Sequence, residues 1–228
     1  MGNVSAIIAA GGNAVRMNGI NKITALLCEK PVIAYSMLAF QAMDEVSEII
    51  VGARACDISV IYEIAEKYAI TKLSGVTDAG TTRQKSIINA LKTVSKDTEL
   101  IAVHDGARPL VNTEYVKQCI RDAEVFGGAV LGVPVKDTIK VVEGGLVTDT
   151  PDRRKLYITQ TPQIFKKKLY FDGVNFALEH DLDFTDDCQL AEAMGIKIHM
   201  TMSNYKNIKI TTPEDLAIAQ AILKGAAQ

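Results

Sequence analysis

The chain contains few of the residues that build metal centres or disulfide frameworks. Its 228 residues include only four cysteines and three histidines. The cysteines, Cys28, Cys56, Cys119 and Cys188, are far apart, and no two of them form a Cys-x-x-Cys pair. This spacing argues against a structural zinc site, whose Cys and His ligands come in closely spaced pairs. We therefore expect reduced thiols and a cytoplasmic protein.

Long apolar runs and an excess of positive charge are also absent. No apolar run approaches the roughly 18 residues that a membrane span requires. The apolar run at residues 4–10 has no basic segment before it, so we expect a core strand there and not a signal peptide. The formal net charge is −2, whereas nucleic-acid binding needs an extended basic surface. We expect no membrane and no nucleic-acid partner, although a few converging cations suffice for a small polyanion.

Several nucleotide-binding and hydrolase motifs are missing as well. The glycine-containing segment at residues 9–17 has neither the Gly-Lys-Ser/Thr of a P-loop nor the Gly-x-Gly-x-x-Gly of a dinucleotide-binding turn. No Gly-x-Ser-x-Gly nucleophile elbow occurs. His104 falls inside a predicted strand end, where we expect a core or edge residue and not a base. Together with the cations described below, these absences favour transfer to a substrate oxygen with electrostatic stabilisation, without a covalent enzyme intermediate.

Hydrophobic periodicity predicts alternating strands and helices. Short β-branched runs predict strands at residues 4–9, 48–52, 100–104 and 128–133. Apolar residues recurring every three or four positions predict helices at residues 31–43, 58–68, 82–94, 113–126 and 213–224. Such alternation predicts an α/β fold with a mostly parallel sheet flanked by helices. The length fits a single domain, residues 1–228.

One segment breaks this alternation. Residues 136–157 contain two β-prone runs on either side of Glu143-Gly144-Gly145, which is a hairpin signal. A hairpin inserted into an α/β domain cannot bury a face by itself. We therefore expect a β-hairpin arm that packs against a second copy of the chain, giving a homodimer.

The candidate site residues lie beside predicted strand ends and turns. The strand at residues 100–104 runs into Asp105-Gly106-Ala107-Arg108, which puts a carboxylate and a guanidinium at the sheet edge where α/β folds bind ligands. Residues 9–12 follow the first strand, and their small side chains let the backbone amides approach phosphate oxygens. As simpler alternatives, a strand-end Asp can cap a helix and a glycine turn can merely connect two elements.

Cations are scattered along the chain in a way that suits phosphate groups. Each lies beside a turn, a glycine or a strand end: Arg16, Lys22, Arg108, Arg153 and Lys209. Arg contacts phosphate through two N–H groups and Lys acts as a point charge. Beside such a cluster, Asp105 would hold a Mg²⁺ that also contacts substrate phosphates. Taken singly, each cation is better explained as a solvated surface charge.

Nine motifs in register resemble one known family. They are Ala9-Ala10-Gly11 with Arg16-Met17, Asn21-Lys22, and residues 83–86, 103–109, 133–138, 152–153, 159–163, 185–187 and 207–216. Together they resemble the 2-C-methyl-D-erythritol 4-phosphate cytidylyltransferases of the non-mevalonate isoprenoid pathway. The resemblance implies a glycosyltransferase-like nucleotidyltransferase fold whose hairpin arm clasps a second subunit. It also implies transfer of CMP from CTP to methylerythritol phosphate, with release of pyrophosphate.

The resemblance further implies roles for individual residues. Arg16 and Lys22 would stabilise charge on the transition state and on the leaving pyrophosphate. Arg153 and Lys209 would hold the acceptor phosphate for in-line attack. The nucleotide would contact Ala9, Ala10, Gly11, Gly12, Gly80, Ser86, Asp105 and Gly106. The acceptor would contact Asp105, Arg108, Thr138, Arg153, Thr161, Thr185 and Lys209, with Thr138 and Arg153 reaching the neighbouring subunit's site.

Two departures from the family pattern concern the first loop. Residues 11–17 are one residue longer than the usual Gly-x-Gly-x-Arg-Met, and Ile23 replaces the usual Gln after Lys22. Both affect the expected grip on the triphosphate. The altered loop leaves a non-catalytic CTP-binding homologue as one alternative. A ribitol 5-phosphate cytidylyltransferase and a nucleotidyltransferase for a sugar 1-phosphate are further alternatives, because they share the expected fold. Gly106-Ala107 and residues 213–216 favour methylerythritol phosphate over ribitol phosphate.

Overall fold

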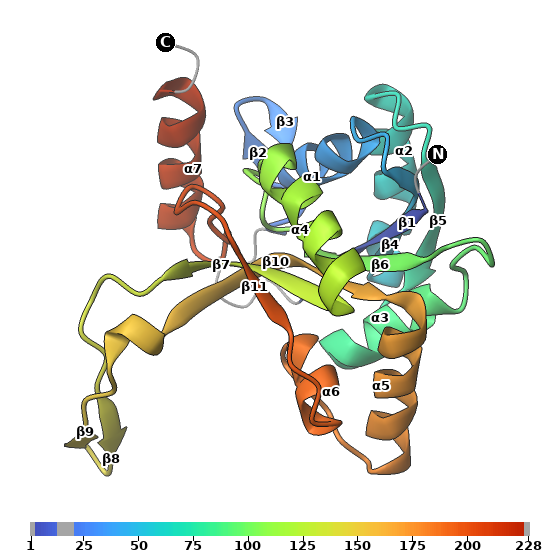
Figure 1. The fold of residues 1–228 in the computed structure, drawn as a ribbon. Coiled ribbons are helices and arrows are strands. Elements are labelled where there is room, and N and C mark those ends of the chain that lie inside the picture. Colours follow the sequence, from blue (N-terminus) through green and yellow to red (C-terminus); the bar gives the residue numbers. More distant parts are fainter. Residues whose placement is uncertain (1–2, 13–20, 226–228) are drawn as a thin grey trace.

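A seven-stranded sheet forms the centre of the molecule. The computed structural model describes residues 3–12 and 21–225. The strand order is β11-β7-β10-β6-β1-β4-β5 (Figure 1). The strands are β1 Val4–Ala10, β4 Val46–Ala53, β5 Leu73–Asp78, β6 Leu100–Asp105, β7 Gly128–Pro134, β10 Tyr157–Lys166 and β11 His199–Met202. Only β10 runs antiparallel to its neighbours within this sheet, which confirms the mostly parallel α/β fold.

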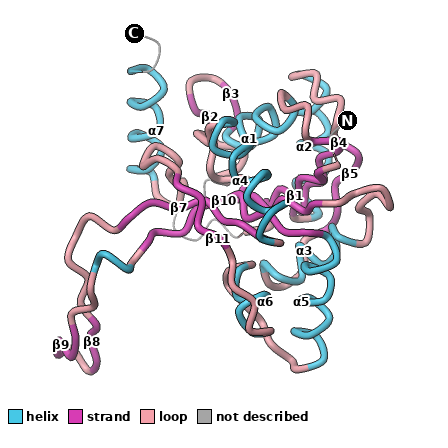
Figure 2. The backbone as a smooth tube through the Cα atoms, in the orientation of Figure 1, coloured by secondary structure: helices cyan, strands magenta, loops and turns pink. Residues whose placement is uncertain are grey.

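Helices cover both faces of this sheet, as Figure 2 shows. They are α1 Val32–Gln41, α2 Ile58–Lys67, α3 Arg83–Leu91, α4 Thr113–Phe126, α5 Lys167–Glu179, α6 Cys188–Ala193 and α7 Pro213–Gly225, with short 3-10 helices η2 Ala55–Asp57 and η3 Arg153–Lys155. Buried residues of α1, α2 and α4 pack on one face, and those of α3, α5 and α6 on the other. Within residues 3–12 and 21–225, no helix combines the length and the apolar character needed to cross a membrane.

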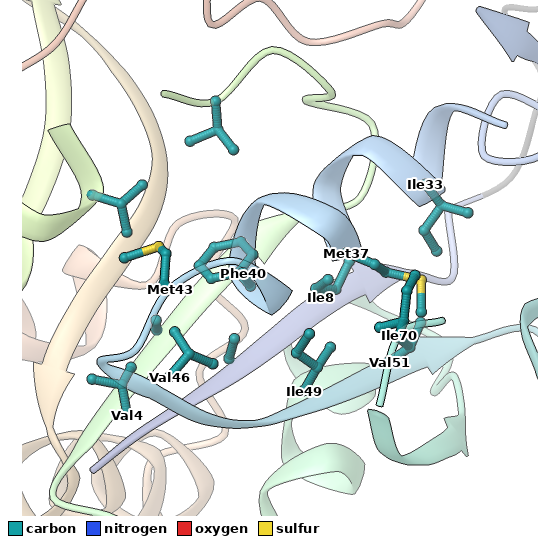
Figure 3. Close-up of a cluster of buried hydrophobic side chains, with 14 of the residues drawn as sticks. Val4, Ile8, Ile33, Met37, Phe40, Met43, Val46, Ile49, Val51 and Ile70 are labelled. Carbon is teal, nitrogen blue, oxygen red and sulfur yellow. The ribbon is translucent and has the colours of Figure 1, made fainter. Parts of the chain in front are cut away.

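The first strand is apolar on both faces because it lies inside the sheet. Ile8 belongs to the cluster that includes Met37 and Phe40 of α1 (Figure 3). Ile7 points the other way and joins Ile87 of α3. Alternate residues of a strand point to opposite faces, so a strand covered on both sides reads as a continuous apolar run. Burying one such side chain contributes about 1.5–3 kcal/mol.

Side-chain caps fix where α3 and α4 begin. Thr82 accepts a hydrogen bond from the Lys85 N–H at 3.2 Å, so α3 starts at Arg83. Asn112 accepts one from the Glu114 N–H at 2.9 Å, and α4 ends at Gly127, whose φ is 88°. A positive φ is readily adopted by glycine. The α3 cap matters for the site because it fixes the position of Arg83.

Two further pairs of short strands lie outside the central sheet. β2 Leu26–Leu27 pairs with β3 Lys30–Pro31. β8 Val141–Glu143 pairs with β9 Leu146–Asp149 in an antiparallel hairpin that extends away from the sheet at the lower left of Figure 1. Gly144 and Gly145 at its turn both have positive φ, which a tight hairpin turn requires. Apolar side chains on these strands, such as Leu146 at 74%, are exposed in the single chain.

Candidate active site

A cavity of about 200 Å³ lies at the carboxyl edge of the sheet, where β1 and β6 end side by side. Ala9 pairs with Asp105 in parallel register, and the Gly106 N–H donates to the Ala9 carbonyl at 2.9 Å. The cavity is lined by Ala9, Gly11, Gly12, Lys22, Ile23, Gly80, Thr81, Thr82, Arg83, Ser86, Asp105, Ala107 and Lys209. A larger hollow of about 810 Å³ lies at the amino end of β6, away from these residues. The smaller cavity is the candidate site because α/β folds bind ligands at the carboxyl edge.

Glycines let two loops meet tightly at one wall of the cavity. A Cβ atom on Gly11 would lie 2.4 Å from the Ala79 Cβ, and one on Gly80 would lie 2.4 Å from the Lys85 Cβ. Only glycine fits such an approach without a shift of the backbone. Gly11, Gly80 and Ser86, which the family resemblance assigns to the nucleotide, therefore share this wall. Ala10 and Gly106 lie next to lining residues in the chain but do not line the cavity themselves.

Asp105 lies among three cations on the floor of the site. Its carboxylate is 2.8 Å from the Lys209 Nζ, 3.5 Å from the Arg83 Nε and 3.6 Å from the Arg108 Nε. Burial alone would raise the pKa of Asp105, but the charges of Lys209, Arg83 and Arg108 hold it well below its usual range. Asp105 is therefore an anion at neutral pH, and the three cations leave a net positive charge beside it. Such a surface suits phosphate groups.

Arg83 connects Asp105 to a second buried carboxylate. Its Nη2 is 2.7 Å from the Asp187 Oδ2, and the Tyr170 hydroxyl donates to the Asp187 Oδ1 at 2.6 Å. Burial disfavours the charged guanidinium, yet the two carboxylates outweigh it and raise the pKa of Arg83. Burial and the charge of Asp187 also raise the pKa of Tyr170. No role was predicted for Arg83 from the sequence, although it belongs to the motif at residues 83–86 and directly follows Thr82, which caps α3.

Lys22 lines the cavity beside the glycine loop. A Cβ atom on Gly12 would lie 3.4 Å from the Lys22 Nζ, so the ammonium group rests against the Gly12 backbone. Lys22 and Lys209 thus approach the same cavity from segments far apart in the sequence. Arg16, the other cation expected in this loop, lies outside the described residues.

His104 is a neutral structural residue behind Asp105. Its ring is buried, and burial lowers the pKa of His104 to about 4. The Arg108 carbonyl can only accept, so the His104 Nε2, 3.2 Å away, carries the ring proton and donates to it. The Nδ1 of the neutral ring is then an acceptor, so the Thr161 hydroxyl donates to it at 3.1 Å while accepting the Asp105 N–H at 3.0 Å. Thr161 therefore supports the backbone at Asp105, and it does not line the cavity.

Arg108 and Asn207 bring the Lys209 segment to the site. The Arg108 Nη1 donates to the Asn207 carbonyl at 2.7 Å. The Asn207 Nδ2 donates to the Thr161 carbonyl at 3.0 Å and to the Gln160 Oε1 at 3.1 Å. These contacts hold residues 207–209 against β10, which brings Lys209 within reach of Asp105.

Three of the expected acceptor residues lie away from this cavity in the same chain. Thr138 and Arg153 are exposed at the base of the hairpin, and the Arg153 Nη1 donates to the Lys136 carbonyl at 3.0 Å. Thr185 is also exposed, and its N–H donates to the Gln189 Oε1 at 3.2 Å. Their contacts with an acceptor, the first two across a dimer, stay predictions.

The site does not have the donor set of a resident metal. Across residues 3–12 and 21–225, no group of three or more His, Cys, Asp or Glu side chains is placed to hold an ion. Asp105, the expected ligand, is engaged by three cations that would repel a divalent metal. A Mg²⁺ ion commonly enters such sites on substrate phosphates instead of on a protein cage.

Comparison with known proteins gives one consistent family. The family model described as IspD, 2-C-methyl-D-erythritol 4-phosphate cytidylyltransferase, matches residues 4–225. A protein of that name from Caldanaerobacter subterraneus is 44% identical over 225 residues, covering 97% of this chain and 99% of the relative. One from Clostridium botulinum is 39% identical over 226 residues, covering 98% and 99%.

Solved structures of similar name share the fold. The 4-diphosphocytidyl-2C-methyl-D-erythritol synthase of Anaerococcus prevotii superposes with a TM-score of 0.87 at 31% identity, covering 98% of this chain and 96% of that one. The 2-C-methyl-D-erythritol 4-phosphate cytidylyltransferase of Thermus thermophilus gives a TM-score of 0.81 at 27% identity, covering 97% and 99%. The match therefore extends over nearly the whole chain.

Proposed function

Because the chain belongs to the 2-C-methyl-D-erythritol 4-phosphate cytidylyltransferase family, we propose that it transfers CMP from CTP to 2-C-methyl-D-erythritol 4-phosphate. The products are 4-diphosphocytidyl-2-C-methyl-D-erythritol and pyrophosphate, in the non-mevalonate route to isoprenoids. The observation that carries this proposal is the Asp105 carboxylate among Lys209, Arg83 and Arg108, beside the glycine wall and Lys22. The cations in this group can neutralise the phosphate charges of two substrates that bind side by side.

The chemical step is a direct displacement at the α-phosphorus of CTP. A phosphate oxygen of the acceptor forms the new O–P bond, and the bond from the α-phosphorus to the pyrophosphate oxygen breaks. Two anionic substrates must approach each other, and negative charge builds up on the leaving pyrophosphate. Fixed cations lower the barrier because they neutralise both the substrate charges and the charge on the leaving group. Lys22, together with Arg16, stabilises that charge in this proposal. Lys209 and Arg108 face the acceptor phosphate, with Arg153 of the second subunit.

The glycine wall is the proposed place of the nucleoside. Gly11, Gly80 and Ser86 expose backbone and a hydroxyl there, and neighbouring amides donate to anionic oxygens. Ala9, Ala10, Gly12, Asp105 and Gly106 complete the proposed nucleotide set, and Thr161 and Thr185 the acceptor set. A Mg²⁺ ion would be held mainly by the triphosphate of CTP and would balance its charge, because the cations around Asp105 disfavour a bare metal at that carboxylate.

The hairpin arm, residues 136–157, is the proposed dimerisation element. Its exposed Val142, Leu146 and Val147 are 54%, 74% and 60% accessible in one chain, and burying them against a second copy would remove that apolar area from water. A homodimer formed in this way would bring Thr138 and Arg153 toward the partner's cavity. We expect the enzyme to act in the cytoplasm.

The experiment is pyrophosphate release from CTP and Mg²⁺ with either 2-C-methyl-D-erythritol 4-phosphate or ribitol 5-phosphate as acceptor. Preferential turnover of the first supports the proposal. Preferential turnover of ribitol phosphate assigns the chain to that acceptor with the same chemistry. No turnover with either acceptor, in a folded protein that binds CTP, would refute catalysis and leave a CTP-binding homologue.

A further inference from the structure

The carboxylate of Asp57 gathers three N–H donors next to the candidate site. Asp57 ends η2, which directly follows β4 at the same edge of the sheet as the cavity. The Arg54 Nε donates to its Oδ2 at 2.6 Å and the Arg54 Nη2 to its Oδ1 at 3.1 Å. The Asn21 Nδ2 donates to the same Oδ1 at 2.9 Å. Asp57 is only 9% exposed, and it lies outside the set of residues lining the cavity.

Asn21 also forms hydrogen bonds with the backbone of its own segment, residues 21–25. Its side-chain oxygen accepts the Ile23 N–H at 3.2 Å, and its backbone carbonyl accepts the Ala25 N–H at 2.9 Å. The orientation of the Asn21 amide is unambiguous, because a carboxylate only accepts and a backbone N–H only donates. The amide therefore holds Asp57 on one side and the backbone after Lys22 on the other.

Ile23 anchors the other end of the same short segment. Its side chain is 3% exposed in the hydrophobic core, and its carbonyl accepts the Ile33 N–H at 3.0 Å. Lys22 is thus flanked by one residue fixed through Asp57 and one fixed in the core, while its own side chain lines the cavity against Gly12. The backbone from which Lys22 extends is held at both neighbours.

We propose that Asp57, gripped by Arg54, is a positioning residue that aims Lys22 into the cavity through Asn21. The rate consequence rests on the proposed function, in which Lys22 stabilises charge on the leaving pyrophosphate. A lysine has a long stem with many rotamers, so its ammonium is placed accurately only when its root is fixed. Misplacement of a catalytic group by about 1 Å can lower the rate about 100-fold. In this way the Asp57 carboxylate, which lies outside the cavity, sets the position of the Lys22 ammonium inside it.

The test is a double-mutant cycle between Asp57→Ala and Lys22→Ala. We measure kcat, the acceptor KM and the CTP Kd for wild type, both single variants and the double variant. If Asp57 acts through Lys22, Asp57→Ala lowers kcat about tenfold in the wild-type background and less than about twofold in the Lys22→Ala background. The same loss in both backgrounds would overturn the proposal, because Asp57 would then act on the fold or on another group.

Two further variants separate positioning from folding. Asn21→Ala removes the link to Lys22 but leaves the Arg54–Asp57 pair in place, so it should reproduce the kcat loss without the loss of stability to urea that Asp57→Ala brings. A full wild-type kcat in Asn21→Ala would contradict the proposed route. Asp172→Ala is the matched control, because it removes a carboxylate from an exposed ion pair with Lys168, and it should leave kcat and KM unchanged.

The same cycle distinguishes this inference from the proposed function. If the wild type turns over neither acceptor, the proposed function has failed, and the cycle is then evaluated on the CTP Kd alone. Asp57→Ala should weaken CTP binding in the wild-type background, with no further weakening in the Lys22→Ala background. Equal weakening in both would overturn the positioning role whatever the reaction is.

Discussion

Replacing Arg83 with methionine should reveal how much the buried charge chain contributes to stability. Arg83→Met keeps a long apolar stem but removes the guanidinium 2.7 Å from Asp187 and 3.5 Å from Asp105. Asp105 retains Lys209 and Arg108 as partners. Asp187, whose side chain is 4% exposed, retains only the Tyr170 hydroxyl among these groups. The main loss of electrostatic stabilisation is therefore at the Asp187 carboxylate.

The size of the effect follows from the geometry of the Asp187 pair. At 2.7 Å and an effective dielectric constant of about 20, the gross attraction is about 6 kcal/mol. Desolvation offsets part of this, and removing one partner from a buried pair typically costs about 3–5 kcal/mol. Because the Arg83 side chain is 24% exposed, water can reach the freed carboxylate, so we expect the lower end, about 3 kcal/mol. For a chain of this length that is about 6–12 °C in Tm.

Urea denaturation of four proteins measures this: wild type, Arg83→Met, Asp187→Asn and the double variant. Asn at position 187 can still accept the Tyr170 hydroxyl proton but carries no charge, so the double variant should recover most of the loss caused by Arg83→Met. A loss below about 1 kcal/mol in Arg83→Met would refute the reasoning, because it would match an ordinary surface ion pair. A double variant as unstable as Arg83→Met would also refute it, because the lost contact would then not be the one with Asp187.

Other predictions address the acceptor, the pH dependence and the arm. Lys209→Ala should raise the acceptor KM at least about tenfold, some 1.4 kcal/mol, while calorimetry finds the CTP Kd nearly unchanged; equal losses would contradict its role. Burial lowers the pKa of His104 to about 4, below the ordinary value of about 6.5, so the unfolded chain takes up the proton first. Stability should therefore fall as pH drops from about 6.5 to 4, by up to about 3 kcal/mol; in urea titrations His104→Gln should flatten this dependence, and an unchanged slope would exclude His104 as its source. Deleting residues 142–147 should shift sedimentation from dimer to monomer, and a stable dimer without them would reject the arm's role.

The regular elements of the fold were predictable because their apolar residues repeat. The helix expected at residues 113–126 is α4 to the residue, and the strand expected at 100–104 is β6 with one residue added. In contrast, β10 was not predicted, since its middle reads Gln160-Thr161-Pro162-Gln163 and lacks a β-prone apolar run. These polar side chains are buried because their partners lie elsewhere in the chain. Gln163, for example, contacts Asp186 and the Cys188 N–H.

The candidate site was predictable as a set of motifs but not as a network. Asp105, Lys209 and Gly11 follow or flank strands, so their convergence at one sheet edge follows from the parallel topology. Arg83 and Asp57 have no such signature, because an arginine after Thr82 and an aspartate after Cys56 also occur as ordinary surface residues in turns. Their roles come from tertiary neighbours more than 20 residues away in sequence, namely Asp105 and Asp187 for Arg83, and Asn21 for Asp57. The residues that flank Arg83 and Asp57 in the sequence do not reveal such long-range contacts.

The position of β1 has a consequence for how the chain is made. β1 is flanked by β4 and β6, and Val4 aligns with Leu100 in the ladder with β6. The apolar residues of β1 therefore stay unpaired on one side until about a hundred further residues have been synthesised and β6 exists. Such long-range strand pairing makes folding slow. The candidate site is completed later still, since Lys209 is synthesised about a hundred residues after Asp105, which it contacts. A chain interrupted before residue 209 therefore lacks one of the three cations around Asp105.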